Sequence, residues 1–304
     1  MKFVTFRQGN RTAAGLLIDG DRVLDLSEGV PGLAGAKSAL DVVLAGEAGL
    51  AAVRDAGKRA NAGNTLALSA VKLLAPIPHP RKNVFCVGRN YLEHVAEGHR
   101  ARGTELKLPE FPQFFTKPQT AIIGPGDDIP YDPQVTQKLD YEVELGVIIG
   151  KRGKNIPKDK ALAHVFGYTI INDVTGRDLQ RRHEQWFKGK ALDGSCPMGP
   201  HIVHASAIKD PQALDIKLRV NGEQRQSSNT KLMIFDLKTI IEQLSLGMTL
   251  EPGDVIATGT PSGVGFAMNP PGLLKGGDVI EAEVEGIGIL KNTVREIPHR
   301  VESE

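Results

Sequence analysis

Two glutamates in one strand-like segment offer the clearest chemistry in this sequence. In LDYEVELGVIIG, residues 139–150, apolar residues alternate with Glu142 and Glu144. Residues two apart on a β-strand point to the same face, so we expect both carboxylates to project side by side. The apolar run that follows predicts a buried strand, where neighbouring carboxylates repel each other unless a cation neutralises them.

A third carboxylate, Asp173, ends another strand-like segment, FGYTIIND. Ligand-binding groups often follow the end of a strand, so we expect Asp173 to join the two glutamates. An all-oxygen ligand set favours hard cations such as Mg²⁺ or Mn²⁺, which leave positions free for a chelating substrate. The alternative is that the glutamates decorate a solvated strand face and Asp173 caps a helix. The apolar strand favours the metal site.

A histidine and a glutamate lie three residues apart in NVFCVGRNYLEHVAEG. His94 and Glu97 can touch on one helix face, and a carboxylate beside an imidazole increases its basicity, as a general base requires. From spacing alone, a surface ion pair explains the two residues better. The polar, Pro-containing stretch that follows, EGHRARGTELKLPEFP, is typical of a mobile lid.

Two further segments carry polar groups that could hold an anionic substrate. WFKGKALDGSCPMGP offers Lys188 and Lys190, either of which could bind a carboxylate or a developing oxyanion. GDVIATGTPSGVGF could hydrogen-bond substrate oxygens through Thr260 or backbone N–H groups. Surface solvation would explain the lysines, and structural turns would explain the glycines equally well.

Composition excludes several classes of function. The formal net charge of +1 provides no broad field for nucleic acid or an anionic membrane, so neither is expected as a partner. The two cysteines, Cys86 and Cys196, lack metal-site or disulfide-framework spacing. No apolar run reaches the roughly 18 residues of a membrane span, and the N-terminus lacks an apolar leader. We therefore expect a cytoplasmic protein.

The elements expected along the chain divide it into two parts. Residues 1–75 begin with alternating runs that predict a hairpin, followed by helical patches in SALDVVLAG and GLAAVRDAG. The Pro-rich LLAPIPHPRKN predicts a linker, so we place a small α+β domain at 1–75 and a catalytic domain at 76–304. Short β-type runs dominate the second part, which predicts a mainly β fold. One helix is expected in TKLMIFDLKTIIEQLSLG, with Ile234, Leu237, Ile241 and Leu244 on one face.

Six segments, in order, resemble the fumarylacetoacetate hydrolase (FAH) family: NVFCVGRNYLEHVAEG, FFTKPQTAIIGPGDDI, LDYEVELGVIIGKRG, GYTIINDVTGRDLQ, GKALDGSCPMGP and GDVIATGTPSGVG. The resemblance spans about residues 80 to 295. It implies a mixed β-sandwich or β-roll catalytic domain, a homodimer, and Mg²⁺ or Mn²⁺ bound by Glu142, Glu144 and Asp173. The first 75 residues resemble a small extra domain found in part of the family. FAMNPPGLLKGGD resembles the bacterial branch, whose labels cover acylpyruvate hydrolases, decarboxylases and tautomerases.

The resemblance also implies roles for individual residues. His94 and Glu97 match a water-activating dyad on a lid helix, and Lys190 matches an active-site lysine. Residues matching substrate contacts are Arg177, Gln180 and Thr260.

Three functional hypotheses follow for a small oxo-acid substrate. The main hypothesis is hydrolytic C–C cleavage of a 2,4-dioxo acid such as an acylpyruvate or fumarylpyruvate, with water activated by His94 and Glu97. The alternative uses the same site without water, for tautomerisation or isomerisation of an unsaturated oxo-diacid such as 2-hydroxyhepta-2,4-diene-1,7-dioate, or for decarboxylation of oxaloacetate. A non-catalytic scaffold, in which a metal cross-links two strands, is the third.

Overall fold

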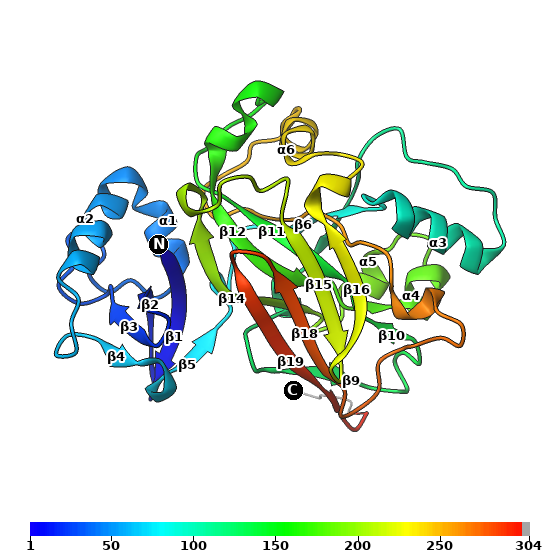
Figure 1. The fold of residues 1–304 in the computed structure, drawn as a ribbon, viewed down its shortest axis with the longest axis horizontal. Helices are drawn as coiled ribbons and strands as arrows, with labels where there is room; N and C mark the ends of the chain where they lie inside the picture. Colours follow the sequence, from blue (N-terminus) through cyan, green and yellow to red (C-terminus); the bar gives the residue numbers. More distant parts are fainter. Residues whose placement is uncertain (300–304) are drawn as a thin grey trace, which may run out of the picture.

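The structure, a computed structural model, describes residues 1–299, so residues 300–304 of the expected 76–304 range lie outside the described part. β-strands dominate. They form a twelve-stranded sheet, a five-stranded sheet and a two-stranded ladder (Figure 1). The mainly β prediction is confirmed. None of the described helices is long and apolar enough to cross a membrane.

The N-terminal segment begins with the expected antiparallel strands, β1 (Lys2–Gln8), β2 (Arg11–Ile18) and β3 (Arg22–Asp25). The two expected helical patches form α1 (Ala39–Leu44) and α2 (Gly46–Lys58). Their apolar faces cover one side of the hairpins, with Val42, Val43, Leu50 and Val53 in the shared core. The remaining elements here are β4 (Leu66–Ala67), the 3₁₀ turn Leu68–Ala70 and β5 (Lys72–Leu74).

Hydrogen bonds join this N-terminal segment to the rest of the chain. Strand β1 pairs with β14 (Cys196–His204), where Phe3 lies opposite Ile202. The twelve-stranded sheet is therefore continuous through residues 1–75, on the left of Figure 1, and the remainder on the right. The proposed domain boundary at residue 75 stays a prediction.

The central strands of the large sheet carry the site. Their order from β1 is β14, β12, β11, β17, β6 and β7. The bounds are β6 (Val84–Gly88), β7 (Gln113–Lys117), β11 (Val143–Ile149), β12 (Val165–Asn172) and β17 (Val255–Ala257). The small strand β8 (Ile122–Ile123) pairs with β14, and β10 (Leu139–Asp140) pairs with β13 (Thr175–Gly176).

The five-stranded sheet packs against one face of the large sheet. Its order is β16 (Glu223–Asn229), β15 (Asp215–Val220), β18 (Val279–Val284), β19 (Gly288–Glu296) and β9 (Asp128–Tyr131). Val143, Leu145 and Val147 of β11 enter the core shared by the two sheets. Because strand residues alternate in direction, Glu142 and Glu144 must point to the opposite face. This layered arrangement is the expected sandwich.

Short helices surround the sheets. They are α3 (Leu92–Arg102), α4 (Arg177–Arg182), α5 (Phe187–Lys190) and α6 (Leu237–Ser245). The 3₁₀ turns are Gln119–Ala121, Lys158–His164, Ala205–Ala207, Thr230–Leu232 and Gly265–Ala267.

The helix expected in residues 230–247 is shorter than predicted. It begins at Leu237, after Asp236 caps it by accepting a 2.7 Å hydrogen bond from the Thr239 N–H. Ile234, assigned to the helix face, lies before the helix. Its N–H donates to the Asn90 carbonyl at 2.7 Å, and this long-range bond competes with an intrahelical one.

A buried histidine of β14 predicts acid sensitivity. His201 is 7% exposed. Burial, and then the charge of Lys2, lower the pKa of His201 from 6.5 to about 4. A hydrogen bond with the Ile287 backbone raises this pKa, but by less. The unfolded chain therefore takes up a proton as pH falls below 6.5 while the folded chain does not. We expect the free energy of unfolding to fall by up to about 3 kcal/mol between pH 6.5 and 4.

Urea unfolding at several pH values checks this expectation. His201→Gln should flatten the stability profile in that pH window, whereas replacing the exposed His79 by glutamine should leave it unchanged. If the unfolding free energy fell equally with pH in wild type and in His201→Gln, other groups would cause the acid sensitivity.

Candidate active site

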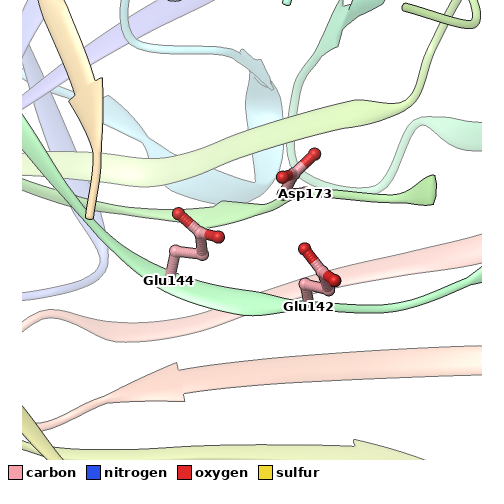
Figure 2. A group of neighbouring side chains, drawn as sticks. All are labelled: Glu142, Glu144 and Asp173. Carbon is pink, nitrogen blue, oxygen red and sulfur yellow. The ribbon is translucent and has the colours of Figure 1, made fainter. Parts of the chain in front are cut away.

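The pairing of β11 with β12 brings the three acidic side chains together. Val143 lies opposite Asn172, and the Asp173 N–H donates to the Glu142 carbonyl at 2.8 Å. One oxygen from each of Glu142, Glu144 and Asp173 lies within 4.8 Å of the others. Figure 2 shows both glutamates rising from one strand toward Asp173 on its neighbour. The structure thus gathers the predicted ligands.

These carboxylates are buried. Glu142 is 4% exposed, Glu144 1% and Asp173 0%. The alternative of a solvated strand face is therefore wrong. Charges removed from water require partners, so the groups around the cluster decide what it can do.

Two buried cations partner Glu142. Lys190 Nζ donates to Glu142 Oε2 and to Asp173 Oδ2, each at 2.6 Å, and Arg177 Nη1 lies 2.7 Å from Glu142 Oε1. Burial alone would raise the pKa of Glu142, but Arg177 and Lys190 hold it well below its usual range. Burial would lower the pKa of Lys190, yet Asp173 and Glu142 keep it above its usual value. Glu142 and Lys190 are therefore charged at neutral pH, as is the guanidinium of Arg177.

A third buried cation, Lys117, forms an ion pair with Asp173. It is 0% exposed and ends β7. Its ammonium lies 2.8 Å from Asp173 Oδ1 and donates to the carbonyls of Val174 and Lys190. Lys117 thus holds Asp173 and the segment that carries Lys190 in one arrangement.

Glu144 differs from its neighbours because no described residue forms an ion pair with it. Its side chain accepts one hydrogen bond, from the Gly259 N–H at 2.8 Å. Burial, and then the charges of Asp173 and Glu142, raise the pKa of Glu144 well above its usual value. Keeping Glu144 ionised in this position requires a further positive charge beside it.

The donor set fits a divalent metal. Around the cluster, four buried acids outnumber three buried cations: the acids are Asp140, Glu142, Glu144 and Asp173, and the cations are Lys117, Arg177 and Lys190. Each carboxylate oxygen has two lone pairs, so one that accepts from a lysine can still bind an ion. Three converging carboxylates can therefore hold a hard dication, which would also neutralise Glu144.

Two local features fix the cations in place. Gly189 in α5 packs so closely on α4 that a Cβ there would lie 2.5 Å from the Gln180 nitrogen, and this contact sets the position of Lys190. Asp140 accepts from Arg177 Nε at 2.9 Å and from the N–H groups of Gly265 and Phe266. Arg177 is thereby oriented toward Glu142.

The predicted His–Glu pair forms on α3. His94 Nδ1 lies 2.9 Å from Glu97 Oε1, and the Gly263 N–H donates to Glu97 Oε2 at 2.9 Å. Both side chains are mostly buried, at 13% and 12% exposure. Because His94 Nδ1 is hydrogen-bonded to Glu97, His94 Nε2 is the ring nitrogen that remains available to a ligand. The surface-ion-pair explanation is therefore wrong, while a catalytic role for the pair stays a prediction.

One cavity of 470 Å³ contains most of the predicted site residues. Its lining includes the following predicted residues: His94, Glu142, Glu144, Arg177, Gln180, Lys190 and Thr260. This volume suits a small organic ligand. Arg177 Nη2 is buried and has no hydrogen-bond partner among the described residues, so it can serve a ligand oxygen. Thr260 Oγ1 already accepts from Gln226 at 2.8 Å and keeps its own proton to donate.

Sequence reasoning missed the residues that position the site. Lys117, Asp140 and Gln226 were assigned no role, although all three are buried. The one local signal was Lys117 itself, a charged residue that ends the apolar run QFFTK before a proline. Lys188, the other lysine considered, is exposed and does not line the cavity.

Removing the charge of Lys117 should destabilise the protein strongly. Lys117→Met leaves Asp173 short of a buried cation, so we expect a loss of about 3–5 kcal/mol of unfolding free energy. Denaturant titration measures this. The matched control is Lys158→Met, whose exposed pair with Asp236 should contribute less than about 1 kcal/mol. Equal effects of the two substitutions would rule out a structural role for the buried pair.

Comparison with known proteins identifies the family. The family profile "Fumarylacetoacetate (FAA) hydrolase C-terminal" matches residues 83–295. Oxaloacetate tautomerase YisK of Bacillus subtilis is 46% identical over 309 residues, covering 97% of this chain and all of the relative. A mitochondrial oxaloacetate tautomerase of Bos taurus is 43% identical, covering 91% of this chain and 85% of that protein.

Solved structures agree. A fumarylacetoacetate hydrolase from Exiguobacterium antarcticum aligns with a TM-score of 0.81 at 45% identity, covering 98% of this chain and 100% of that one. A 5-carboxymethyl-2-hydroxymuconate delta-isomerase from Mycobacterium smegmatis aligns with a TM-score of 0.74 at 34% identity, with coverages of 98% and 100%. The resemblance noted in the six segments is thus confirmed, and the chain belongs to the fumarylacetoacetate hydrolase family of enzymes.

Proposed function

We propose that this protein catalyses the keto–enol tautomerisation of oxaloacetate or a closely related short oxo-diacid, with Mg²⁺ or Mn²⁺ bound by Glu142, Glu144 and Asp173. The observation that carries the proposal is that His94, a proton-transfer group, lines the same cavity as Glu142 and Glu144, two of the three converging carboxylates. The names of the relatives from Bacillus subtilis and Bos taurus support this reaction over hydrolysis.

The inner end of the cavity suits the 2-oxo-acid part of such a substrate. A divalent metal, when bound, supplies Lewis-acid stabilisation of negative charge on the enolate oxygen. Arg177 offers to the same region its Nη2, which has no hydrogen-bond partner among residues 1–299, and Thr260 offers a hydroxyl. The ammonium of Lys190 adds fixed positive charge nearby, so the side chains favour the enolate over the neutral forms.

Tautomerisation moves one proton between oxygen and carbon. In the direction from enol to ketone, the O–H bond at C2 breaks and a C–H bond forms at C3, with no change in composition. His94 can accept the first proton on Nε2 and deliver a proton to C3, because Glu97 holds Nδ1 and so fixes the ring. The reaction needs no water in the site.

A direct assay tests the proposal. Fresh enol oxaloacetate is mixed with protein and Mg²⁺, and the loss of enol absorbance is followed in the ultraviolet. We expect protein-dependent acceleration that a chelator abolishes, without release of carbon dioxide. A rate equal to that of Mg²⁺ in buffer would contradict the proposal.

Hydrolysis of a 2,4-dioxo acid, the main hypothesis from the sequence, is the second candidate. The name of the Exiguobacterium antarcticum structure favours it. His94 and Glu97 would then activate water instead of shuttling a proton. A panel of acylpyruvates separates the two reactions, because hydrolysis releases pyruvate and tautomerisation does not. Metal-dependent pyruvate release faster than enol loss from oxaloacetate would favour hydrolysis.

The homodimer is also a proposal. The family resemblance implies it. Light scattering on the purified protein should give twice the 32.7 kDa chain mass.

A further inference from the structure

Three arginines outside the buried carboxylate cluster line the same cavity. Arg89 follows β6, Arg102 ends α3 and Arg181 lies in α4. Arg102 and Arg181 are exposed and Arg89 is half-buried, so they surround the cavity where it opens to solvent. We call these three residues the arginine rim.

The arginine rim has no carboxylate partner in the part of the chain that the structure describes. Among residues 1–299, none of the three arginines forms an ion pair, whereas Arg177 is bound to both Asp140 and Glu142. Of the lining acids outside the buried cluster, Asp178 accepts from Thr136 Oγ1, from the N–H of Gln137 and from its own helix. Glu184 remains, so cations outnumber acids at the opening.

Arg89 is held in place by an aromatic wall. Its guanidinium lies 5.5 Å from the centre of the Trp186 ring, a cation–π distance. Trp186 packs so tightly on Gly88 that a Cβ there would lie 2.1 Å from the ring. The ring also meets Phe115 edge-on at 5.6 Å between centroids. The cation–π contact with Trp186 holds Arg89 beside the cavity, although no acid among the described residues pairs with it.

Arg102 is placed by a glycine on its own helix. Its Nη2 lies 2.9 Å from the position that a Cβ on Gly98 would occupy, so the guanidinium folds back over the helix instead of extending into solvent. Burial, and then the charges of Arg89, Arg181 and Arg177, lower the pKa of Arg102. Because Arg89, Arg102 and Arg181 line one cavity, their like charges repel each other, and an anion between them would relieve that repulsion.

We propose that the arginine rim binds the second carboxylate of a short oxo-diacid and that Arg102 selects dicarboxylates over monocarboxylate 2-oxo acids. This inference rests on the proposed function in one respect, since it assumes that the 2-oxo-acid end binds at Glu142, Glu144 and Asp173. At that end, Arg177 and Lys190 are already paired with acids, so they contribute little to a distant second charge. Guanidinium groups suit a planar carboxylate because they can donate two parallel hydrogen bonds.

Binding of two unreactive probes tests the selection. Calorimetry with the Mn²⁺-loaded protein compares 2-oxoglutarate with 2-oxopentanoate, which has the same carbon chain but lacks the second carboxylate. We expect 2-oxoglutarate to bind about tenfold more tightly, the lower range for a charge-assisted hydrogen bond at a partly exposed site. Arg102→Gln should remove most of that difference by weakening 2-oxoglutarate alone, and Arg181→Gln should reduce it.

The control is Arg100→Gln, which changes an exposed arginine on the same helix that does not line the cavity. It should leave both affinities unchanged. Equal binding of the two probes by wild type, or equal weakening of both by Arg102→Gln, would overturn the inference. The enol oxaloacetate assay on the same samples is independent: selective binding without turnover would refute the proposed function and leave the arginine rim standing.

Discussion

Glu144→Gln is expected to abolish tight binding of Mg²⁺ and Mn²⁺ and to lower activity by at least about 10³-fold, because metal ions contribute several kcal/mol of charge stabilisation in such reactions. Glutamine has nearly the same shape and can still accept the hydrogen bond from the Gly259 N–H. The substitution therefore removes charge while preserving local packing. Calorimetric titration with Mn²⁺ measures the lost affinity without reference to turnover.

The same substitution should have the opposite effect on the metal-free protein. Burial, and then Asp173 and Glu142, raise the pKa of Glu144, so its charged form is unfavourable in the fold. We expect metal-free Glu144→Gln to be more stable than metal-free wild type by about 1–3 kcal/mol. Mn²⁺ should stabilise wild type against urea and leave the variant unchanged.

Glu281→Gln, on β18, is the matched control: Glu281 is half-buried and pairs with Lys291. It should leave the Mn²⁺ affinity unchanged and alter the unfolding free energy by less than about 1 kcal/mol. A Glu144→Gln protein that still bound one Mn²⁺ with wild-type affinity would contradict this account of the ligand set.

His94→Gln is expected to lower kcat for tautomerisation by about 10²- to 10⁴-fold, the usual contribution of general acid–base catalysis. Affinity for Mn²⁺ should be unchanged, because His94 is hydrogen-bonded to Glu97 and is not one of the three carboxylates that would bind the metal. Stopped-flow kinetics with enol oxaloacetate and calorimetry with Mn²⁺ separate the two effects.

The control for His94 lies on the same helix. His99 is bonded to Thr104 and does not line the cavity, so His99→Gln should retain wild-type kcat. If His94→Gln also retained it, the proton would have to travel by another group, and the role proposed for the His–Glu pair would be wrong.

The ligand set could be predicted from sequence because local patterns encode it. Alternation in residues 139–150 placed Glu142 and Glu144 on one face, and the apolar run after them indicated burial. The end of FGYTIIND marked Asp173 in the same way. The first inference required only the two-residue period of a strand and the second only the end of a strand, and the structure has these features in β11 and β12.

The supporting residues could not be predicted in this way because their partners are distant in the chain. Lys117 contacts Asp173 and the Lys190 carbonyl, 73 positions further on. No local period in QFFTK specifies those contacts. The pairing of β1 with β14 is another case, since Phe3 and Ile202 lie opposite each other but are 199 positions apart in the chain.

Competition between local and long-range bonds explains the misplaced start of α6. The apolar period of residues 230–247 was correct from Leu237 onward, where Ile241 and Leu244 are buried as expected. Before that point the chain bonds to Asn90, which lies far away in sequence. Helical periodicity shows which residues would share one face of a helix. It gives no information about distant hydrogen-bond partners, such as Asn90, that compete with the helix.

Binding of oxalate with and without metal tests the central claim most directly. Oxalate presents two adjacent carboxylates, as the 2-oxo-acid end of the proposed substrate presents a carbonyl beside a carboxylate. Calorimetry should detect one Mn²⁺ per chain, and oxalate should bind to the loaded protein but not measurably to the metal-free one. Equal oxalate affinity in both forms, or no uptake of Mn²⁺ or Mg²⁺, would contradict the assignment of Glu142, Glu144 and Asp173 as a metal centre for oxo-acids.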